Sequence, residues 1–255
     1  MAELVYPPAI RLALGVFRSL DLRIDVVGLE HVPATGGGVV VMNHTGYLDF
    51  ALAGVPFWRA QRRVVRFMAK DEVFRHKLSG PLMRGMKHIP VDRSAGSAAF
   101  RAALAALQAG EFVGVFPEAT ISRSFCLKEF KDGAVRMAMQ ADVPIIPVVL
   151  WGSQRVWTKG RKRDFKAARH TPISITVGAP LLPQKGVRRP EMTAELISRM
   201  QTLLEQTQAR YPGRPSGDDD RWWLPAHLGG TAPTLEEAAA LDAAEAAARA
   251  AKRAA

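Results

Sequence analysis

The sequence has little cysteine, little acidic charge and no long apolar run. Its single cysteine, Cys126, excludes an intramolecular disulfide and a cysteine-based zinc cluster. Because no predominantly apolar stretch reaches about 18 residues, we expect no membrane-spanning helix. Asp and Glu number 24 against 35 Lys and Arg, which gives a net charge of +11 and favours an anionic partner. Nucleic acid, an acidic membrane surface and a phosphorylated substrate all satisfy that condition.

The N-terminus also lacks the features of a secretory signal. Glu3 stands where positive charge is expected, Arg11 and Arg18 interrupt the apolar region, and no small-residue cleavage site follows. We therefore expect the protein to begin at Met1 and to stay in the compartment where it is made.

Several common catalytic and binding motifs are missing. There is no G-x-S-x-G nucleophile elbow and no H-E-x-x-H metal motif. Gly80 and Gly85 are followed by Met86 instead of the lysine of a phosphate-binding loop. The basic segments contain no zinc finger, no RNP motif and no interleaved aromatic residues, so nucleic acid is not expected as a partner. We predict no metal site.

Strand-like and helix-like segments alternate along most of the chain. We expect strands at 22–28, 38–43, 63–69, 88–93, 112–116, 144–152 and 173–178. We expect helices at 9–20, 48–58, 73–86 with a break at Gly80-Pro81, 95–109 between a Ser94 cap and Gly110, 128–141 and 190–211. The alternation predicts an α/β fold with a central, mostly β sheet flanked by helices. An amphipathic N-terminal helix (1–21), a main α/β domain (22–211) and a linker with a C-terminal helical arm (212–255) complete the predicted organisation.

Both ends of the chain allow alternative interpretations. Ile10, Leu14 and Phe17 form an apolar stripe at helical spacing, which predicts either a helix packed on the core or one lying at a membrane surface. In the arm, Trp222 and Trp223 are expected to pin the chain to the core instead of forming an interface.

The stretch "VVVMNHTGYLDF" places polar residues directly after an apolar strand. On a continuous helix, side chains five residues apart point about 140° away from each other, so His44 and Asp49 do not meet through helical spacing. They can meet if His44 lies in the turn after the strand and Asp49 in the first turn of the next helix. The carboxylate then accepts the Nδ1 proton and leaves Nε2 to take a proton from an alcohol. Without a nucleophile in the chain, such a pair suits activation of a substrate hydroxyl.

The His-x4-Asp pattern alone is weak, and a buried histidine beside a solvated aspartate is the default interpretation. Two other polar residues strengthen the catalytic interpretation, because Glu118 and Arg93 lie at the ends of two further predicted strands. Binding groups collect at the strand ends of α/β sheets.

Four segments in order then resemble the motifs of the glycerolipid acyltransferase family, of the 1-acylglycerol-3-phosphate acyltransferase type. "NHTGYLDF" resembles its N-H-x4-D block, and "HIPVDR" resembles its second block, which ends in an arginine. "FPEATISRS" resembles its F-P-E-G-T-R-S block, and "VPIIPV" its fourth. "FKDGAVRMA" resembles the lysine-and-glycine segment that follows the third block. The four blocks span residues 43–148.

The resemblance implies transfer of an acyl chain from acyl-CoA or acyl-carrier protein to a lysophospholipid hydroxyl, with no further cofactor. His44 is implied as the general base and Asp49 as its orienting partner. Arg93 is implied to bind the acceptor phosphate. The remaining implied substrate-binding residues are Asn43, Glu118, Thr120, Arg123 and Lys131.

Two positions depart from the family pattern. Ala119 stands where the family has glycine and Ile121 where it has arginine, so Arg123 is the candidate to replace the missing guanidinium. We further expect backbone N–H groups of the turn at His44 and of the helix N-terminus that follows it to stabilise the oxyanion of the reaction.

A lipid substrate favours the interfacial interpretation of helix 9–20 and predicts peripheral attachment to the cytoplasmic face of the cell membrane. Two basic segments support that prediction. Residues 59–93 carry ten Lys and Arg against three acidic residues, and residues 155–169 carry seven against one. Two alternatives within the family stay open: another acceptor (a lyso-glycolipid, a lysophospholipid with a headgroup, or glycerol 3-phosphate) and a catalytically inactive lipid-binding relative, against which the intact His44 and Asp49 argue.

Overall fold

A seven-stranded sheet forms the centre of the computed structural model, which describes residues 3–92 and 96–254. The strands are β1 (Arg23–Val27), β2 (Gly38–Met42), β3 (Val65–Lys70), β4 (Ile89–Val91), β5 (Phe112–Val115), β6 (Ile145–Trp151) and β7 (Pro172–Val177). Their order is β1-β7-β6-β2-β5-β3-β4. Neighbouring strands are parallel except for β6 and β7, which pair antiparallel. This arrangement confirms the predicted α/β class and central sheet.

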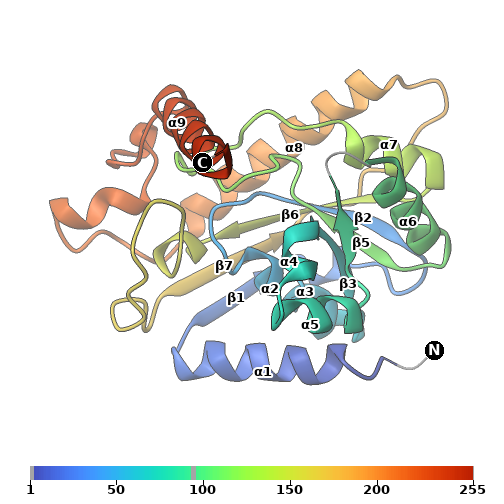
Figure 1. Ribbon diagram of the computed structural model, residues 1–255, viewed down its shortest axis with the longest axis horizontal. Helices are drawn as coiled ribbons and strands as arrows, with labels where there is room; N and C mark the ends of the chain where they lie inside the picture. Colours follow the sequence, from blue (N-terminus) through green and yellow to red (C-terminus); the bar gives the residue numbers. More distant parts are fainter. Residues whose placement is uncertain (1–2, 93–95, 255) are drawn as a thin grey trace.

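The α-helices cover both faces of the sheet (Figure 1). They are α1 (Tyr6–Ser19), α2 (Asp49–Ala53), α3 (Val55–Gln61), α4 (Asp71–Arg75), α5 (Ser79–Gly85), α6 (Gly96–Gln108), α7 (Gly133–Ala141), α8 (Arg189–Arg210) and α9 (Leu235–Ala254). Side chains of the buried strand β2 alternate between two cores, as the two-residue period of a strand requires. Val39 and Val41 pack with α6, α7 and α8, whereas Val40 and Met42 pack with α1, α2 and α3.

All seven predicted strands are present, but three helical predictions were wrong in detail. The segment 48–58 forms two helices, α2 and α3, and the helix expected from residue 128 begins at Gly133. The break predicted at Gly80-Pro81 instead separates α4 from α5 at residues 76–78. Pro81 lies in the first turn of α5, where a missing backbone N–H costs no intrahelical hydrogen bond. The predicted Ser94 cap lies outside the described residues.

Helix α1 presents opposite faces to the body and to solvent. Phe17 is buried, and Ile10 and Leu14 pack against the cores, so the stripe predicted from periodicity is the inward face. Leu12 and Val16 remain 71% and 48% exposed. Any membrane contact of α1 must therefore use this second face.

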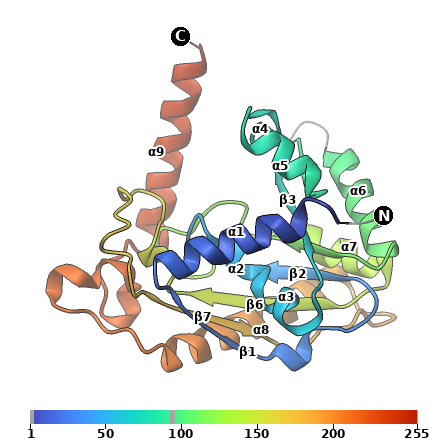
Figure 2. The ribbon, with the colours of Figure 1, turned by 90° about the horizontal axis from the view of Figure 1, so that it is seen from below.

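The C-terminal arm returns to the body before it ends in α9. Trp223 is buried, its ring lies 5.7 Å from that of Tyr211, and the guanidinium of Arg155 lies over it at 4.4 Å. The predicted pinning of the arm to the core is confirmed for this residue. Beyond it, α9 projects away from the body (Figure 2). None of the helices within the described ranges is long and apolar enough to cross a membrane.

Candidate active site

Three parallel neighbouring strands end at the same edge of the sheet and supply the polar centre. His44 follows β2, Glu118 follows β5, and Ser153 follows β6. Since β2 lies between β5 and β6, the turn after β2 is flanked by loops on both sides. Carboxyl ends of parallel strands are the usual location of binding groups in such sheets.

His44 and Asp49 form the predicted pair. Nδ1 of His44 lies 3.0 Å from Oδ2 of Asp49, which begins α2 and is fully buried. The same carboxylate oxygen accepts the backbone N–H groups of Thr45 and Gly46, both at 2.7 Å. Oδ1 accepts the hydroxyl of Ser153 at 2.5 Å. Three donors, two backbone N–H groups and the Ser153 hydroxyl, already point at this carboxylate. The arrangement favours the tautomer in which Nδ1 of His44 donates to it as well and Nε2 is the free nitrogen.

The imidazole ring is fixed from a second direction. It stacks on Phe116, with ring centroids 4.1 Å apart and planes inclined by 25°, and its side chain is 20% exposed. A ring held by a buried carboxylate and an aromatic face, yet open to solvent, is preorganised for proton transfer to a bound substrate.

Glu118 supports the turn from the neighbouring strand. Its Oε1 accepts the backbone N–H of His44 at 3.0 Å, and its Oε2 accepts that of Lys128 at 3.3 Å. Burial raises the pKa of Glu118 to about 8. Both carboxyl oxygens thus bind backbone groups, and Glu118 links the turn at His44 to the segment that carries Lys128.

The turn does not provide the oxyanion donors predicted from the sequence. The N–H groups of Thr45 and Gly46 donate to Asp49, that of His44 donates to Glu118, and that of Tyr47 donates to the carbonyl oxygen of Trp157. Asp49 and Glu118 thus engage three of these N–H groups, whereas the contribution predicted for the helix N-terminus stays a prediction. A buried carboxylate without such donors would be strongly destabilising.

The other predicted binding residues differ in what their side chains contact. The amide of Asn43 is buried and bonds both backbone groups of Leu150 in β6, at 2.9 and 2.8 Å. The hydroxyl of Thr120 accepts a hydrogen bond from Nζ of Lys128. Lys131 is exposed, and its backbone N–H donates to the carbonyl oxygen of Pro117 at 3.2 Å.

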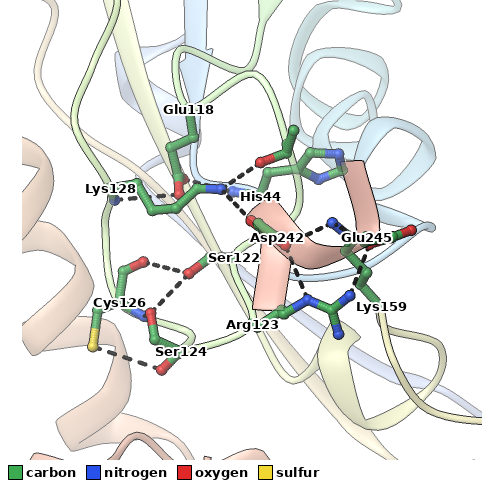
Figure 3. Close-up of polar contacts among 11 residues, drawn as sticks. His44, Glu118, Ser122, Arg123, Ser124, Cys126, Lys128, Lys159, Asp242 and Glu245 are labelled. Carbon is green, nitrogen blue, oxygen red and sulfur yellow. Dashed lines mark hydrogen bonds and ion pairs between the residues drawn. The ribbon is translucent and has the colours of Figure 1, made fainter. Parts of the chain in front are cut away.

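Arg123 does not reach back toward the position of the missing arginine at Ile121, which is buried. Its guanidinium binds two carboxylates of α9, Asp242 at 2.9 Å and Glu245 at 2.8 Å (Figure 3). Lys128 and Lys159 bind the same helix. We call Arg123, Lys128 and Lys159 the basic site. The two lysines were missed from the sequence, although Lys159 lies in one of the basic segments.

Arg93 lies outside the described residues. Near it in sequence, α4, α5 and β4 enclose a hollow of about 600 Å³. Its lining carries several basic side chains: Arg75, His76, Lys77, Arg84 and His88. Within the described ranges, no group of three or more His, Cys, Asp or Glu is arranged to hold a metal ion.

Comparison with known proteins agrees with this geometry. The sequence profile of the Acyltransferase family matches residues 23–151, the span that carries His44, Asp49 and Glu118. The chain belongs to the Acyltransferase family. This acyltransferase is 31% identical over 199 residues to the 1-acyl-sn-glycerol-3-phosphate acyltransferase of Bacillus subtilis (strain 168), a match covering 75% of the present chain and 93% of that protein. It is 32% identical over 164 residues to the enzyme of the same name from Limnanthes douglasii, covering 63% of the chain and 55% of the plant protein.

The fold of this acyltransferase is also found in a solved structure. The crystal structure of the 1-acyl-sn-glycerophosphate acyltransferase PlsC from Thermotoga maritima superimposes with a TM-score of 0.66 over 80% of each chain, at 23% sequence identity. The sheet and its flanking helices therefore have the fold of that structure. The family match and the Bacillus subtilis relative show that the protein is an acyltransferase enzyme.

Proposed function

We propose that this acyltransferase transfers an acyl chain from acyl-CoA or acyl-carrier protein to the free hydroxyl of a lysophosphatidate-type acceptor in glycerophospholipid synthesis. The observation that carries the proposal is the His44–Asp49 pair, at 3.0 Å, at the carboxyl end of β2 within the family-matched span. The names of the Bacillus and Limnanthes relatives support the acceptor class.

The proposed reaction needs no nucleophile from the protein. Nε2 of His44 accepts the proton of the acceptor hydroxyl while its oxygen attacks the thioester carbonyl carbon. Asp49 keeps Nδ1 protonated and stabilises the imidazolium that forms. The tetrahedral intermediate collapses with cleavage of the C–S bond, and the departing thiolate takes the proton from Nε2. An ester and a free thiol result.

We also propose that the enzyme acts while bound peripherally at the cytoplasmic face of the membrane. The exposed face of α1 carries Leu12 and Val16. Beside its N-terminal half lies α5, where Leu82 is 44% exposed, and Leu78 just before that helix is 83% exposed. Exposed apolar side chains next to basic residues are typical of surfaces that bind anionic lipid headgroups.

A thiol-release assay with two acceptors tests the proposed acceptor. Lysophosphatidate and monoacylglycerol differ by the phosphate, so wild type should use the first well and the second poorly. Arg93→Ala should raise the KM for lysophosphatidate and leave the donor's KM and the monoacylglycerol rate nearly unchanged. Arg93→Lys should recover part of the loss, because an ammonium supplies charge without the fork of a guanidinium. An equal loss on both acceptors would assign Arg93 to the fold or the donor site, and preference for another lysolipid in a wider panel would replace the proposed acceptor.

A further inference from the structure

Five polar contacts join the basic site to the C-terminal helix. Asp242 accepts hydrogen bonds from Nε of Arg123 at 2.9 Å and Nζ of Lys159 at 2.7 Å, and Nζ of Lys128 lies 3.6 Å away. Glu245 contacts the same arginine and Lys159, each at 2.8 Å. Burial acts to raise the pKa of Asp242, but hydrogen bonds from Lys159 and Arg123 hold that pKa below its usual value. Two carboxylates are thus bound by three cations.

The basic site adjoins the catalytic turn through the residues that carry it. Ser122, which precedes the arginine of the site, donates its N–H to the carbonyl oxygen of His44 at 2.7 Å. Thr158, which precedes the second lysine, donates its hydroxyl to the carbonyl oxygen of Thr45 at 2.6 Å. Figure 3 draws the contacts of α9 with the basic site together with the turn that carries His44. A ligand in the basic site would therefore lie on loops that are hydrogen-bonded to the turn of the proposed base.

The guanidinium in this site has a prepared position. A Cβ atom at Gly160 would lie 2.3 Å from Nη1 of Arg123, and this glycine has a φ of +81°. Glycine avoids the strain of this left-handed backbone conformation and leaves the guanidinium where it stands. With α9 docked, the side chains of Arg123 and Lys159 are each 15% exposed, so both cations are partly shielded from solvent where they meet the carboxylates.

Apart from these ion pairs, little holds α9 to the body. Within residues 235–251 only Ala238 is buried, whereas Leu235 and Leu241 are 50% and 47% exposed. The rest of the helix extends away from the fold (Figure 2). Helices normally dock through an apolar stripe, so a helix docked through carboxylates is easily released by a competing anion or by salt.

We propose that the basic site binds a phosphate group and that α9 competes for it, with Asp242 and Glu245 occupying the positions of the phosphate oxygens. The proposal rests on the function proposed above and adds a regulatory segment to it. An arginine and two lysines suit a phosphate at least as well as they suit carboxylates. The phosphate can belong to the acceptor, to the acyl donor or to an anionic lipid headgroup.

Competition by α9 predicts the direction in which substrate affinity changes when the helix is released. Only molecules in which α9 has left the basic site can bind the phosphate ligand. The apparent affinity therefore equals the intrinsic affinity multiplied by the fraction of molecules with an open site. Neutralising the two carboxylates should therefore improve substrate use. A helix that only braces the loops of the active site would have the opposite effect, because its release would loosen them.

The decisive variant is the isosteric double substitution Asp242→Asn/Glu245→Gln in the full chain. Its matched control is Asp219→Asn/Glu236→Gln, which changes the net charge equally at two exposed carboxylates. We expect the first variant to lower the KM for the phosphorylated acceptor about fivefold or more, a typical size for coupling between two sites, and the control to leave it unchanged. Unchanged or higher KM values in the first variant would overturn the proposal.

Hydrogen exchange of the α9 amides provides a readout independent of turnover. In wild type, exchange within residues 235–251 should accelerate when a phosphate-bearing probe binds. Short-chain lysophosphatidate, coenzyme A and phosphatidylglycerol vesicles are the three probes, with phosphatidylcholine vesicles as the control, and the probe that accelerates exchange identifies the source of the phosphate. If none does, the helix is a fixed brace and the proposal is wrong. Absence of acyl transfer with every acceptor would instead remove the proposed function, while the exchange result would still decide the role of α9.

Discussion

Nδ1 of His44 bonds the carboxylate of Asp49 at 3.0 Å, and the chain contains a second pair of the same kind on its surface. There, Nδ1 of His170 lies 2.6 Å from Oδ2 of Asp21, with side chains 58% and 55% exposed. The first pair joins a histidine that follows the central strand β2 to a fully buried carboxylate, whereas the second pair is solvated. Substitutions in the surface pair therefore serve as controls for the same substitutions at His44 and Asp49.

His44→Ala should reduce acyl transfer by about 10²–10⁴, the usual cost of losing a general base. The thermal unfolding midpoint should change little, because the imidazole is partly exposed and the backbone contacts of the turn remain. His170→Ala should leave transfer at the wild-type rate. Thiol release and thermal unfolding measured on both variants check the prediction, and near-normal turnover in His44→Ala would remove this residue from the mechanism.

Asp49→Asn should lower turnover strongly and keep most of the affinity for the acceptor. The asparagine amide no longer holds Nδ1 protonated, so the imidazole can adopt the wrong tautomer. The free energy of unfolding should fall as well. The NH₂ group of the new asparagine would face N–H and O–H donors that bind the carboxylate in the wild type, and two donors cannot bond each other. Asp21→Asn should do neither. A higher KM with unchanged kcat would mean that Asp49 binds substrate instead of orienting the base.

The sheet and the His44–Asp49 pair were predictable because both depend on residues that are close together in the sequence. Apolar runs mark all seven strands, and His44 and Asp49 are close enough in sequence for one turn to bring them together. The remainder of the site depends on long-range contacts. Ser153 reaches Asp49 from 104 positions away and Asp242 reaches Arg123 from 119, and no periodicity links such residues. The sequence also does not say which acceptor a backbone N–H will bind, so the engagement of the turn at His44 by Asp49 and Glu118 could not be predicted.

Glu118 should make the stability of the protein depend on pH. Burial raises the pKa of Glu118 from its usual 4.5 to about 8, so between these values the folded chain retains a proton that the unfolded chain has released. The stability linked to the neutral carboxyl is fully present below pH 4.5 and is lost as the pH rises through about 8. One such proton contributes a slope of up to about 1.4 kcal/mol per pH unit.

Urea unfolding of wild type and Glu118→Gln across this pH range measures the effect. The free energy of unfolding should fall more steeply with rising pH in wild type, whatever the absolute stability of the variant. Glu236→Gln, at an exposed position of α9, should keep the wild-type slope. Parallel curves for Glu118→Gln and wild type would show that Glu118 is already ionised in the folded protein at low pH.

Ala119→Gly should stabilise the protein. Ala119 has a φ of +61°, a left-handed conformation in which the Cβ atom is strained, and glycine occupies the corresponding family position in the resemblance described above. Relief of that strain exceeds the entropy that glycine adds to the unfolded chain, for a net gain of up to about 1 kcal/mol. Ala105→Gly, in the exposed interior of α6, should cost about that amount instead. Thermal unfolding of both variants measures these opposite changes in stability. A loss of stability at both positions would contradict the strain argument.

Membrane binding should depend on the outward face of α1. Leu12 is 71% exposed there, and its insertion among lipid headgroups would bury most of that apolar surface. Leu12→Gln should lower partitioning onto phosphatidylglycerol vesicles about tenfold, because a leucine side chain contributes about 1.5 kcal/mol or more when it leaves water. Leu182→Gln is the matched control, because Leu182 is 62% exposed but lies far along the chain from α1, after β7. Its neighbour Leu181 belongs to the core that packs with α8, not to the core that packs with α1.

Salt separates the apolar part of this attachment from the electrostatic part. Arg11→Gln should weaken binding at low ionic strength and have little effect at high salt, where exposed charges are screened, whereas the effect of Leu12→Gln should persist. Co-sedimentation at two salt concentrations measures both. Equal partitioning of the Leu12 and Leu182 variants would show that α1 serves the core alone. The basic segments would then be left as the part of the surface that meets the lipid.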